Sequence, residues 1–183
     1  SHTALRQALR AAAATAASRG ADAFYHVDLP AVLSRVERWR EALPRVDPYY
    51  AVKCNPDAEL LATLAAAGVG FDCASQAEMA AVTALGVHPT RIVYANPCKP
   101  PAHLAYAAHA GIRLHAFAWE GELEKTAQLA PRAQLLLRIA VDDAKAQCAL
   151  SNKYGAAMHE VPAVLATAER PGLPVRGGSF PPG

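Results

Sequence analysis

Four side chains suited to amine chemistry end or interrupt apolar stretches of this sequence. Lys53 ends the run PYYAVK, Asp72 lies late in GVGFDCA, and Asn96 ends RIVYAN. Arg138 stands inside the apolar run LLLRIAV. Because an unpaired buried charge is costly to desolvate, each of these positions needs an explanation. A lysine amine that condenses with an aldehyde, surrounded by an anion, an amide and a second cation, is one such explanation.

Short β-branched or aromatic runs alternate with Ala/Leu-rich stretches, which is typical of β/α units around a parallel sheet. The first five strands recur about every 20 residues, close to the least that a strand, a turn and a crossover helix need. This regularity favours a partial (β/α)8 barrel over a doubly wound sheet, although the units alone do not decide closure. The expected strands are residues 49–53, 68–74, 91–96, 112–118, 133–141 and 173–180. The expected helices between them are residues 57–68, 75–86, 101–111 and 120–130.

The carboxyl ends of barrel strands gather at one mouth, so Lys53, Asp72, Asn96 and Arg138 are expected to meet there. In the alternative reading, Asp72 and Arg138 form an internal ion pair and Lys53 extends its ammonium group to the surface. The joint placement of the four residues favours a functional site. A lysine beside Arg138 and away from bulk water should have a lowered pKa, which leaves its amine free to react.

We expect two regions along the chain. Residues 1–28 form an N-terminal segment with an Ala-rich helix and then a strand at AFYHVDL (residues 23–29). Residues 29–183 form the barrel domain, which begins with a helix at residues 30–43 with Pro30 at its first position. The first 20 residues contain Arg and Ser and no acidic residue, which also resembles an organelle transit peptide. The aperiodic stretch 142–155 is expected to be a loop.

Composition excludes several classes of function. The chain has 183 residues, 52% of them hydrophobic, and a net charge of +2 that is spread along the sequence, so no basic stripe predicts nucleic-acid binding. No apolar run reaches the ~18 residues that would suggest a membrane span. The cysteines form no C-x-x-C pair, so we expect no metal site, and reduced thiols in the cytoplasm. They are Cys54, Cys73, Cys98 and Cys148.

Four stretches resemble consecutive signatures of the eukaryotic-type ornithine decarboxylase family, whose members are fold-type III enzymes that use pyridoxal 5'-phosphate. They are LPRVDPYYAVKCN, LAAAGVGFDCASQAEM, RIVYANPCKP and LLLRIAVDDAKAQCALSNKYGA. The resemblance extends from about Ala23 to Phe180. It implies an α/β fold with a barrel of the alanine racemase type, a homodimer, and decarboxylation of a basic amino acid, foremost ornithine to putrescine.

The resemblance also assigns residues. It implies that Lys53 is the catalytic lysine that carries the cofactor, and that Asp72, Glu78 and Arg138 line the cofactor pocket. It implies no metal. Pyridoxal phosphate would supply the electron sink for the loss of carbon dioxide.

Other family features have no counterpart in this chain. About six of eight barrel strands are expected, without the C-terminal β-domain. A His motif, a Gly-rich phosphate loop, the acid that pairs with the pyridine nitrogen and the residues that reach across the dimer would lie beyond Gly183. We therefore expect an N-terminal portion that is inactive by itself. The choice among ornithine, lysine, arginine and diaminopimelate depends on those missing residues.

Two other functions stay open. Antizyme inhibitors resemble the same family without decarboxylating, and the corresponding antizyme-binding region is residues 101–124. The retained Lys53, Asp72, Glu78 and Arg138 favour an enzyme instead. A small pyridoxal-phosphate carrier is disfavoured because the phosphate loop is missing. The basic and aromatic residues of the possible antizyme surface are His103, Tyr106, His109, Arg113 and His115, for which an ordinary helix and strand is the simpler explanation.

Overall fold

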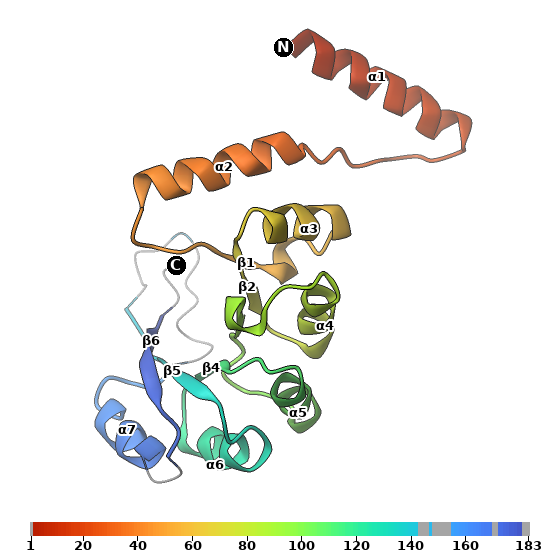
Figure 1. Cartoon of the computed structure of the whole chain (residues 1–183). Coiled ribbons are helices and arrows are strands. Elements are labelled where there is room, and N and C mark those ends of the chain that lie inside the picture. Colours follow the sequence, from red (N-terminus) through yellow and green to blue (C-terminus); the bar gives the residue numbers. More distant parts are fainter. Residues whose placement is uncertain (1, 143–146, 148–154, 170–171, 181–183) are drawn as a thin grey trace.

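Six parallel strands form one sheet in the order in which they occur along the chain (Figure 1). The computed structural model describes residues 2–142, 147, 155–169 and 172–180. Within these residues each strand pairs in parallel with the next one. The partial β/α barrel predicted from the sequence is confirmed. The strands are β1 (Tyr49–Ala51), β2 (Gly70–Cys73), β3 (Ile92–Tyr94), β4 (Leu114–Phe117), β5 (Gln134–Arg138) and β6 (Val175–Ser179).

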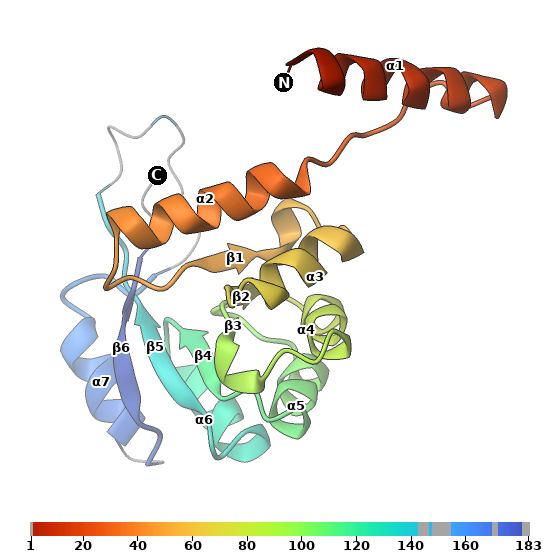
Figure 2. The same ribbon diagram turned by 45° about the horizontal axis from the view of Figure 1, so that its top comes forward.

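Helices connect the strands and follow one another along one face of the curved sheet (Figures 1 and 2). Because all pairings are parallel, each connection must cross back over the sheet. The helices are α3 (Ala58–Ala66), α4 (Gln76–Ala84), α5 (Pro101–His109), α6 (Glu120–Leu129) and α7 (Val161–Glu169), with short 3-10 turns η1 (Val52–Cys54) and η2 (Pro89–Arg91). The sequence correctly predicts α3 to α6, including Ser75 as the N-cap of α4. It does not predict α7.

The apolar core lies between the sheet and these helices. Phe71 of β2 and Leu135 of β5 are completely buried against it. Side chains alternate between the two faces of a strand, so the neighbours of these residues point to the other face. On β5, Leu135 and Leu137 are buried whereas Leu136 and Arg138 are only partly buried. The same alternation turns Asp72 of β2 away from the helices.

The strands are shorter than predicted, and the difference matters at β1. This strand ends at Ala51, and Lys53 lies in the 3-10 turn η1 instead of in the strand. Asn55 precedes Pro56 and is extended, as residues before proline tend to be. The chain therefore turns between the strand and this extended residue before α3 begins.

The strand predicted at residues 23–29 does not form. Residues 21–28 lack regular structure, and Leu29 is already the first residue of α2 (Leu29–Ala42). No neighbouring strand is available to this segment within the described residues, although its composition favours extended structure. The aromatic side chain of Tyr25 is 98% exposed. Most of the loop expected at residues 142–155 lies outside the described residues.

The N-terminal helix α1 (His2–Ser18) forms as predicted. It extends away from the sheet in two views, and residues 19–28 connect it to α2 (Figures 1 and 2). Helix α2 packs on the body of the molecule through Val36, which is buried, and its N-terminus is capped by the side chain of Asp28. Residues 1–28 and 29–183 remain our proposed division into segments.

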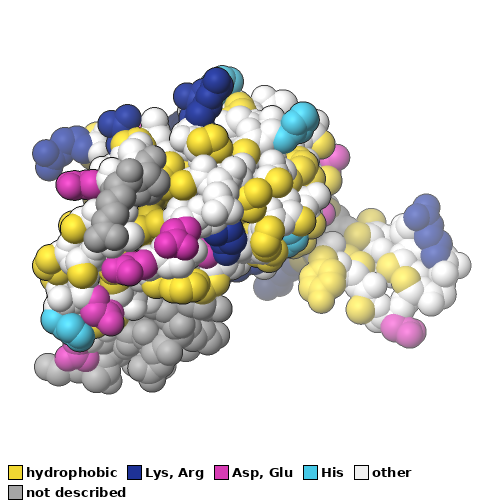
Figure 3. Space-filling view, turned by 90° about the horizontal axis from the view of Figure 1, so that it is seen from below, with side chains coloured by type: hydrophobic (Ala, Val, Ile, Leu, Met, Phe, Trp, Pro, Cys, Tyr) yellow, Lys and Arg dark blue, Asp and Glu magenta, His cyan; other side chains and the backbone are white. Residues whose placement is uncertain are grey.

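The charged surface supports no extended basic stripe on the face that is shown in Figure 3. Basic side chains gather along the upper border of that face, and acidic side chains lie mainly lower and to the left (Figure 3). Among the described helices none has the length and apolar character to cross a membrane. No cluster of three or more potential metal-binding side chains occurs among the described residues.

The core predicts how single truncations affect stability. Leu135 is fully buried. The variant Leu135→Ala should lower the free energy of unfolding by about 3 kcal/mol, because the truncation leaves a cavity. The matched control Leu129→Ala, in the exposed last turn of α6, should cost far less. Denaturant unfolding of both variants checks this. Equal losses would contradict the assigned core.

Candidate active site

Lys53 lies two residues beyond the end of β1, in the turn η1. Val52 beside it is completely buried, whereas the Lys53 side chain is exposed. The expectation that this lysine is withdrawn from bulk water is therefore wrong. The cause is the turn η1, which moves Lys53 out of the strand. An exposed amine at the strand end remains accessible to an aldehyde.

Asp72 brings the sequence-predicted residues together electrostatically. It lies on β2 opposite Ala51 of β1 and is partly buried. Burial raises its pKa, and the negative charge of Glu78 raises it further. The positive charges of Lys53 and Arg138 act in the opposite direction. The charges of Lys53, Glu78 and Arg138 therefore all act on Asp72.

Glu78 has a clear structural role at the start of α4. Its Oε2 accepts a hydrogen bond from the backbone N–H of Ala74 at 2.8 Å, and its Oε1 accepts one from the Ser75 hydroxyl at 3.2 Å. The backbone N–H of Glu78 donates to Ser75 Oγ at 3.3 Å. This arrangement resembles a capping box, except that Glu78 binds the backbone N–H of Ala74, one residue before the N-cap Ser75. It fixes the carboxylate near Asp72, and contact with a cofactor stays a proposal.

Arg138 and Asn96 occupy two further strand ends. Arg138 is the last residue of β5, where it pairs with Ser179 of β6. The side chain of Asn96, beyond β3, connects two loops: its Nδ2 donates to Ala74 O at 3.5 Å, and its Oδ1 accepts from the backbone N–H of Cys98 at 3.2 Å. The neighbouring ends of β2 and β3 are thereby linked.

A buried charge cluster next to these loops was missed by the sequence reasoning. We call Lys99, Glu122 and Lys125 the Lys99 cluster. The Lys99 and Glu122 side chains are 0% and 1% exposed, and their charged atoms are 2.9 Å apart. Lys125 lies 2.7 Å from the other oxygen of Glu122. The sequence signal was an acid and a lysine three residues apart on one helix, which places them on the same face.

Two aromatic groups lie beside the Lys99 cluster. The ring centre of Tyr94 is 5.8 Å from Lys99 Nζ, and the Tyr94 ring meets that of His115 edge to face at 5.8 Å. Burial raises the pKa of the Tyr94 hydroxyl. His115 is completely buried, and its Nε2 is 2.9 Å from Ile112 O.

The possible antizyme surface is smaller than the sequence predicts. His115 cannot reach a partner because it is buried, and the Tyr106 hydroxyl is engaged with Thr83 Oγ1 at 3.1 Å. His109 and Arg113 remain exposed. The alternation along β4 turns His115 into the core, which a list of basic and aromatic residues does not reveal.

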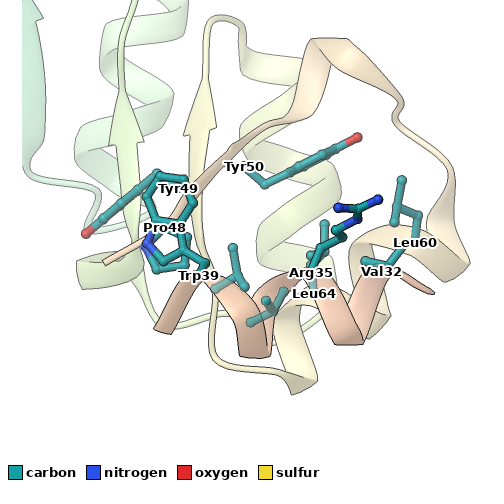
Figure 4. Close-up of a pocket in the computed structure, with 10 residues that line it drawn as sticks. Val32, Arg35, Trp39, Pro48, Tyr49, Tyr50, Leu60 and Leu64 are labelled. Carbon is teal, nitrogen blue, oxygen red and sulfur yellow. The ribbon is translucent and has the colours of Figure 1, made fainter. Parts of the chain in front are cut away.

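An apolar hollow lies elsewhere on the molecule, between α2, α3 and β1 (Figure 4). Its volume is about 340 Å³, and the aromatic ring of Tyr50 and the aliphatic side chains of Val32 and Leu64 line it. None of the sequence-predicted site residues lines this hollow. It is therefore separate from the charged groups at the strand ends.

The residues present fit the aldehyde end of pyridoxal phosphate. Lys53 is exposed and carries a primary amine, the type of group that condenses with an aldehyde, and Arg138 carries a permanent positive charge that would attract an anionic cofactor. The positive charge of Lys53 lowers the pKa of the partly buried Asp72, so the two groups are near enough to interact electrostatically. No other described lysine has this placement: Lys99 is buried in an ion pair and Lys125 donates to Glu122.

The fold, in which parallel strands follow one another in chain order with connecting helices, is that of a partial β/α barrel. The family described as "Pyridoxal-dependent decarboxylase, pyridoxal binding domain" matches residues 29–181. The chain therefore belongs to the pyridoxal-dependent decarboxylase family, and pyridoxal phosphate is its cofactor.

Particular relatives agree with this family. The ornithine decarboxylase of Mus pahari is 50% identical over 159 residues, which cover 87% of this chain and 34% of that protein. The arginine decarboxylase of Paramecium bursaria Chlorella virus bound to agmatine superposes with a TM-score of 0.80 at 38% identity, covering 82% of this chain and 41% of that one. Lysine decarboxylase from Selenomonas ruminantium gives a TM-score of 0.75 at 39% identity, covering 82% and 41%. The chain thus spans about a third of the length of the curated relative.

The buried and exposed thiols predict a labelling pattern. Burial raises the pKa of the Cys73 thiol to about 12, and its side chain is completely buried. Cys54 and Cys98 are exposed. Iodoacetamide at neutral pH should modify Cys54 and Cys98 and leave Cys73 unmodified until the protein is unfolded. Mass spectrometry of peptides checks this, and rapid labelling of Cys73 in the folded protein would contradict the described burial.

His115 predicts a loss of stability in acid. Burial lowers its pKa to about 4, below the ordinary 6.5, and the nearby Lys99 charge acts in the same direction. The unfolded chain therefore binds a proton below pH 6.5 that the folded protein does not. Stability from this group is complete above that pH and falls by about 3 kcal/mol as the pH drops to 4.

Unfolding measured from pH 7 to pH 4 tests this contribution. His115→Gln should show a smaller acid-induced loss than the native protein, because the titrating group is removed. His109→Gln, which alters an exposed histidine, is the matched control and should keep the native slope. If the free energy of unfolding fell equally with pH in all three proteins, the role of His115 would be refuted.

Proposed function

We propose that the protein carrying this domain decarboxylates a basic amino acid, with ornithine converted to putrescine as the foremost reaction. The observation that carries the proposal is the amine of Lys53, exposed at a strand end, whose charge acts on the partly buried Asp72. Lys53 is the catalytic residue, and Asp72, Glu78 and Arg138 are its proposed companions in the cofactor pocket.

Each residue has a proposed task that follows from its chemistry. Lys53 holds the cofactor covalently through its amine. Arg138 attracts the anionic cofactor, and Asp72 balances the positive charges on the inner face of the sheet. Glu78 holds the loop at Ala74 in place. Pyridoxal phosphate, when bound, supplies the electron sink for the loss of carbon dioxide.

Ornithine is favoured among the basic amino acids by sequence similarity. The curated relatives from mouse and rat species, which are 48–50% identical over 159 residues, are ornithine decarboxylases. Among the solved structures, the arginine, lysine and ornithine decarboxylases are 38%, 39% and 36% identical, so the preference for ornithine rests on the curated relatives. Ornithine, arginine and lysine all carry a second cationic group, so a basic side chain is the shared property.

Further parts of the proposal concern assembly and location. A homodimer is proposed from family membership, and a cytoplasmic location agrees with the exposed thiols of Cys54 and Cys98. Antizyme binding is the second candidate function. The exposed His109 and Arg113 favour it, and together with Arg132 they line a hollow of about 400 Å³. The burial of His115 weakens it.

Covalent capture of the cofactor tests the catalytic assignment. Incubation with pyridoxal phosphate and reduction with borohydride should label the peptide that contains Lys53. Lys53→Arg keeps the charge but lacks a primary amine, so labelling of this peptide should disappear. Lys125, which is partly exposed, serves as an internal control. Label on Lys125 with none on Lys53 would overturn the assignment.

Activity is measured separately on the protein that carries this domain. Carbon dioxide release from ornithine, lysine and arginine should be greatest with ornithine and should be abolished by Lys53→Arg. Activity that survives this substitution would contradict the proposed function, whichever substrate is preferred.

A further inference from the structure

The Lys99 cluster grips the loop that follows β3 from several sides. Lys99 Nζ donates to Ala116 O of β4 at 2.6 Å and to Asn96 O of its own loop at 3.4 Å. Glu122 Oε1 accepts from both the ammonium and the backbone N–H of Lys99, the latter at 3.1 Å. Lys125 Nζ donates to Lys99 O. One loop is thus fixed to a strand and a helix.

Burying these charges is an unfavourable way to stabilise the fold. Taking two charges out of water costs several kcal/mol per ion before their attraction is counted. Burial lowers the pKa of Lys99, and the carboxylate of Glu122 opposes this effect. A pair of apolar residues of similar size would often stabilise a core as well. The property that distinguishes the Lys99 cluster from such an apolar pair is the precise placement of its hydrogen bonds.

Hydrogen bonds lead from the Lys99 cluster to the proposed cofactor pocket. Lys99 binds Asn96 O, the side chain of Asn96 donates to Ala74 O at 3.5 Å, and the N–H of Ala74 donates to Glu78 Oε2 at 2.8 Å. Ala74 lies two residues beyond Asp72. The two links made by Asn96 are long and hence weak, so they depend on accurate placement of its loop.

We propose that Lys99 and Glu122 are positioning residues, which hold Asn96 and, through Ala74, the part of the cofactor pocket that contains Asp72 and Glu78. This inference rests on the proposed function. Neither residue touches the pocket: each acts through the loop at Asn96. Removing the ammonium should leave the carbonyl of Asn96 without its lysine donor and loosen the contact with Ala74.

Amide hydrogen exchange in the absence of cofactor tests the link directly. Lys99→Met removes the charge and keeps much of the chain length. The amides of Ala74 and Cys98 should then exchange about tenfold faster relative to the amide of Leu135, because tenfold corresponds to about 1.4 kcal/mol, close to the lower value of a lost hydrogen bond to a charged group. Lys99→Arg retains donors and should restore much of the protection. It also provides a test if Lys99→Met does not fold.

A matched control separates positioning from general destabilisation. Leu64→Ala truncates a buried residue of α3 that has no hydrogen bond to the Lys99 cluster. It should accelerate exchange without singling out Ala74 and Cys98. Pyridoxal phosphate should bind about tenfold more weakly to Lys99→Met than to Leu64→Ala, at a temperature where both are folded.

Two outcomes would overturn the inference. One is unchanged exchange at Ala74 and Cys98 in Lys99→Met, and the other is equal cofactor affinity in Lys99→Met and Leu64→Ala. Failure of the native protein to bind pyridoxal phosphate would count against the proposed function. Amide exchange at Ala74 would still decide whether Lys99 holds the loop at Asn96 and Ala74 in place, because that measurement needs no cofactor.

Discussion

The candidate site depends on one constraint, the alternation of side chains along parallel strands whose carboxyl ends lie at the same edge of the sheet. On β2 this alternation buries Phe71 and Cys73 under the helices and turns Asp72 to the other face. On β5 it does the same with Leu137 and Arg138. Shifting either strand by one residue would place its charge in the apolar core. The hydrophobic core and the charged site are therefore two results of the same register.

Two opposing sets of influences act on the pKa of Asp72. Burial and the Glu78 charge raise its pKa, so the fold disfavours the ionised carboxylate, while Lys53 and Arg138 favour it. Groups with such conflicting influences are common at functional sites, because a ligand can supply the missing compensation. Here the balance depends on groups from four separate segments of chain. The pKa of this carboxylate therefore depends on the correct assembly of these segments.

The strand order and most helices were predictable because they depend on local patterns. Ser75 and Glu78 stand three residues apart before an apolar run, and Ser75 caps α4 as expected by accepting from the backbone N–H of Glu78. The placement of Lys53 in a turn and the burial of His115 were not predicted. The first follows from the 3-10 turn η1 after β1, and the second from which face of β4 meets the helices. The Lys99 cluster was missed because its contacts join loop, strand and helix far apart in sequence.

The strand before Lys53 is held differently from the one that carries Asp72. Strand β1 has three residues and, among the described strands, pairs with β2 alone, whereas β2 is paired on both sides. Lys53 itself follows this strand in the turn η1, whereas Asp72 lies within a strand. The amine and the carboxylate are therefore carried by different kinds of backbone. A ligand that is attached to Lys53 and held near Asp72 would tie the turn η1 to the interior of the sheet.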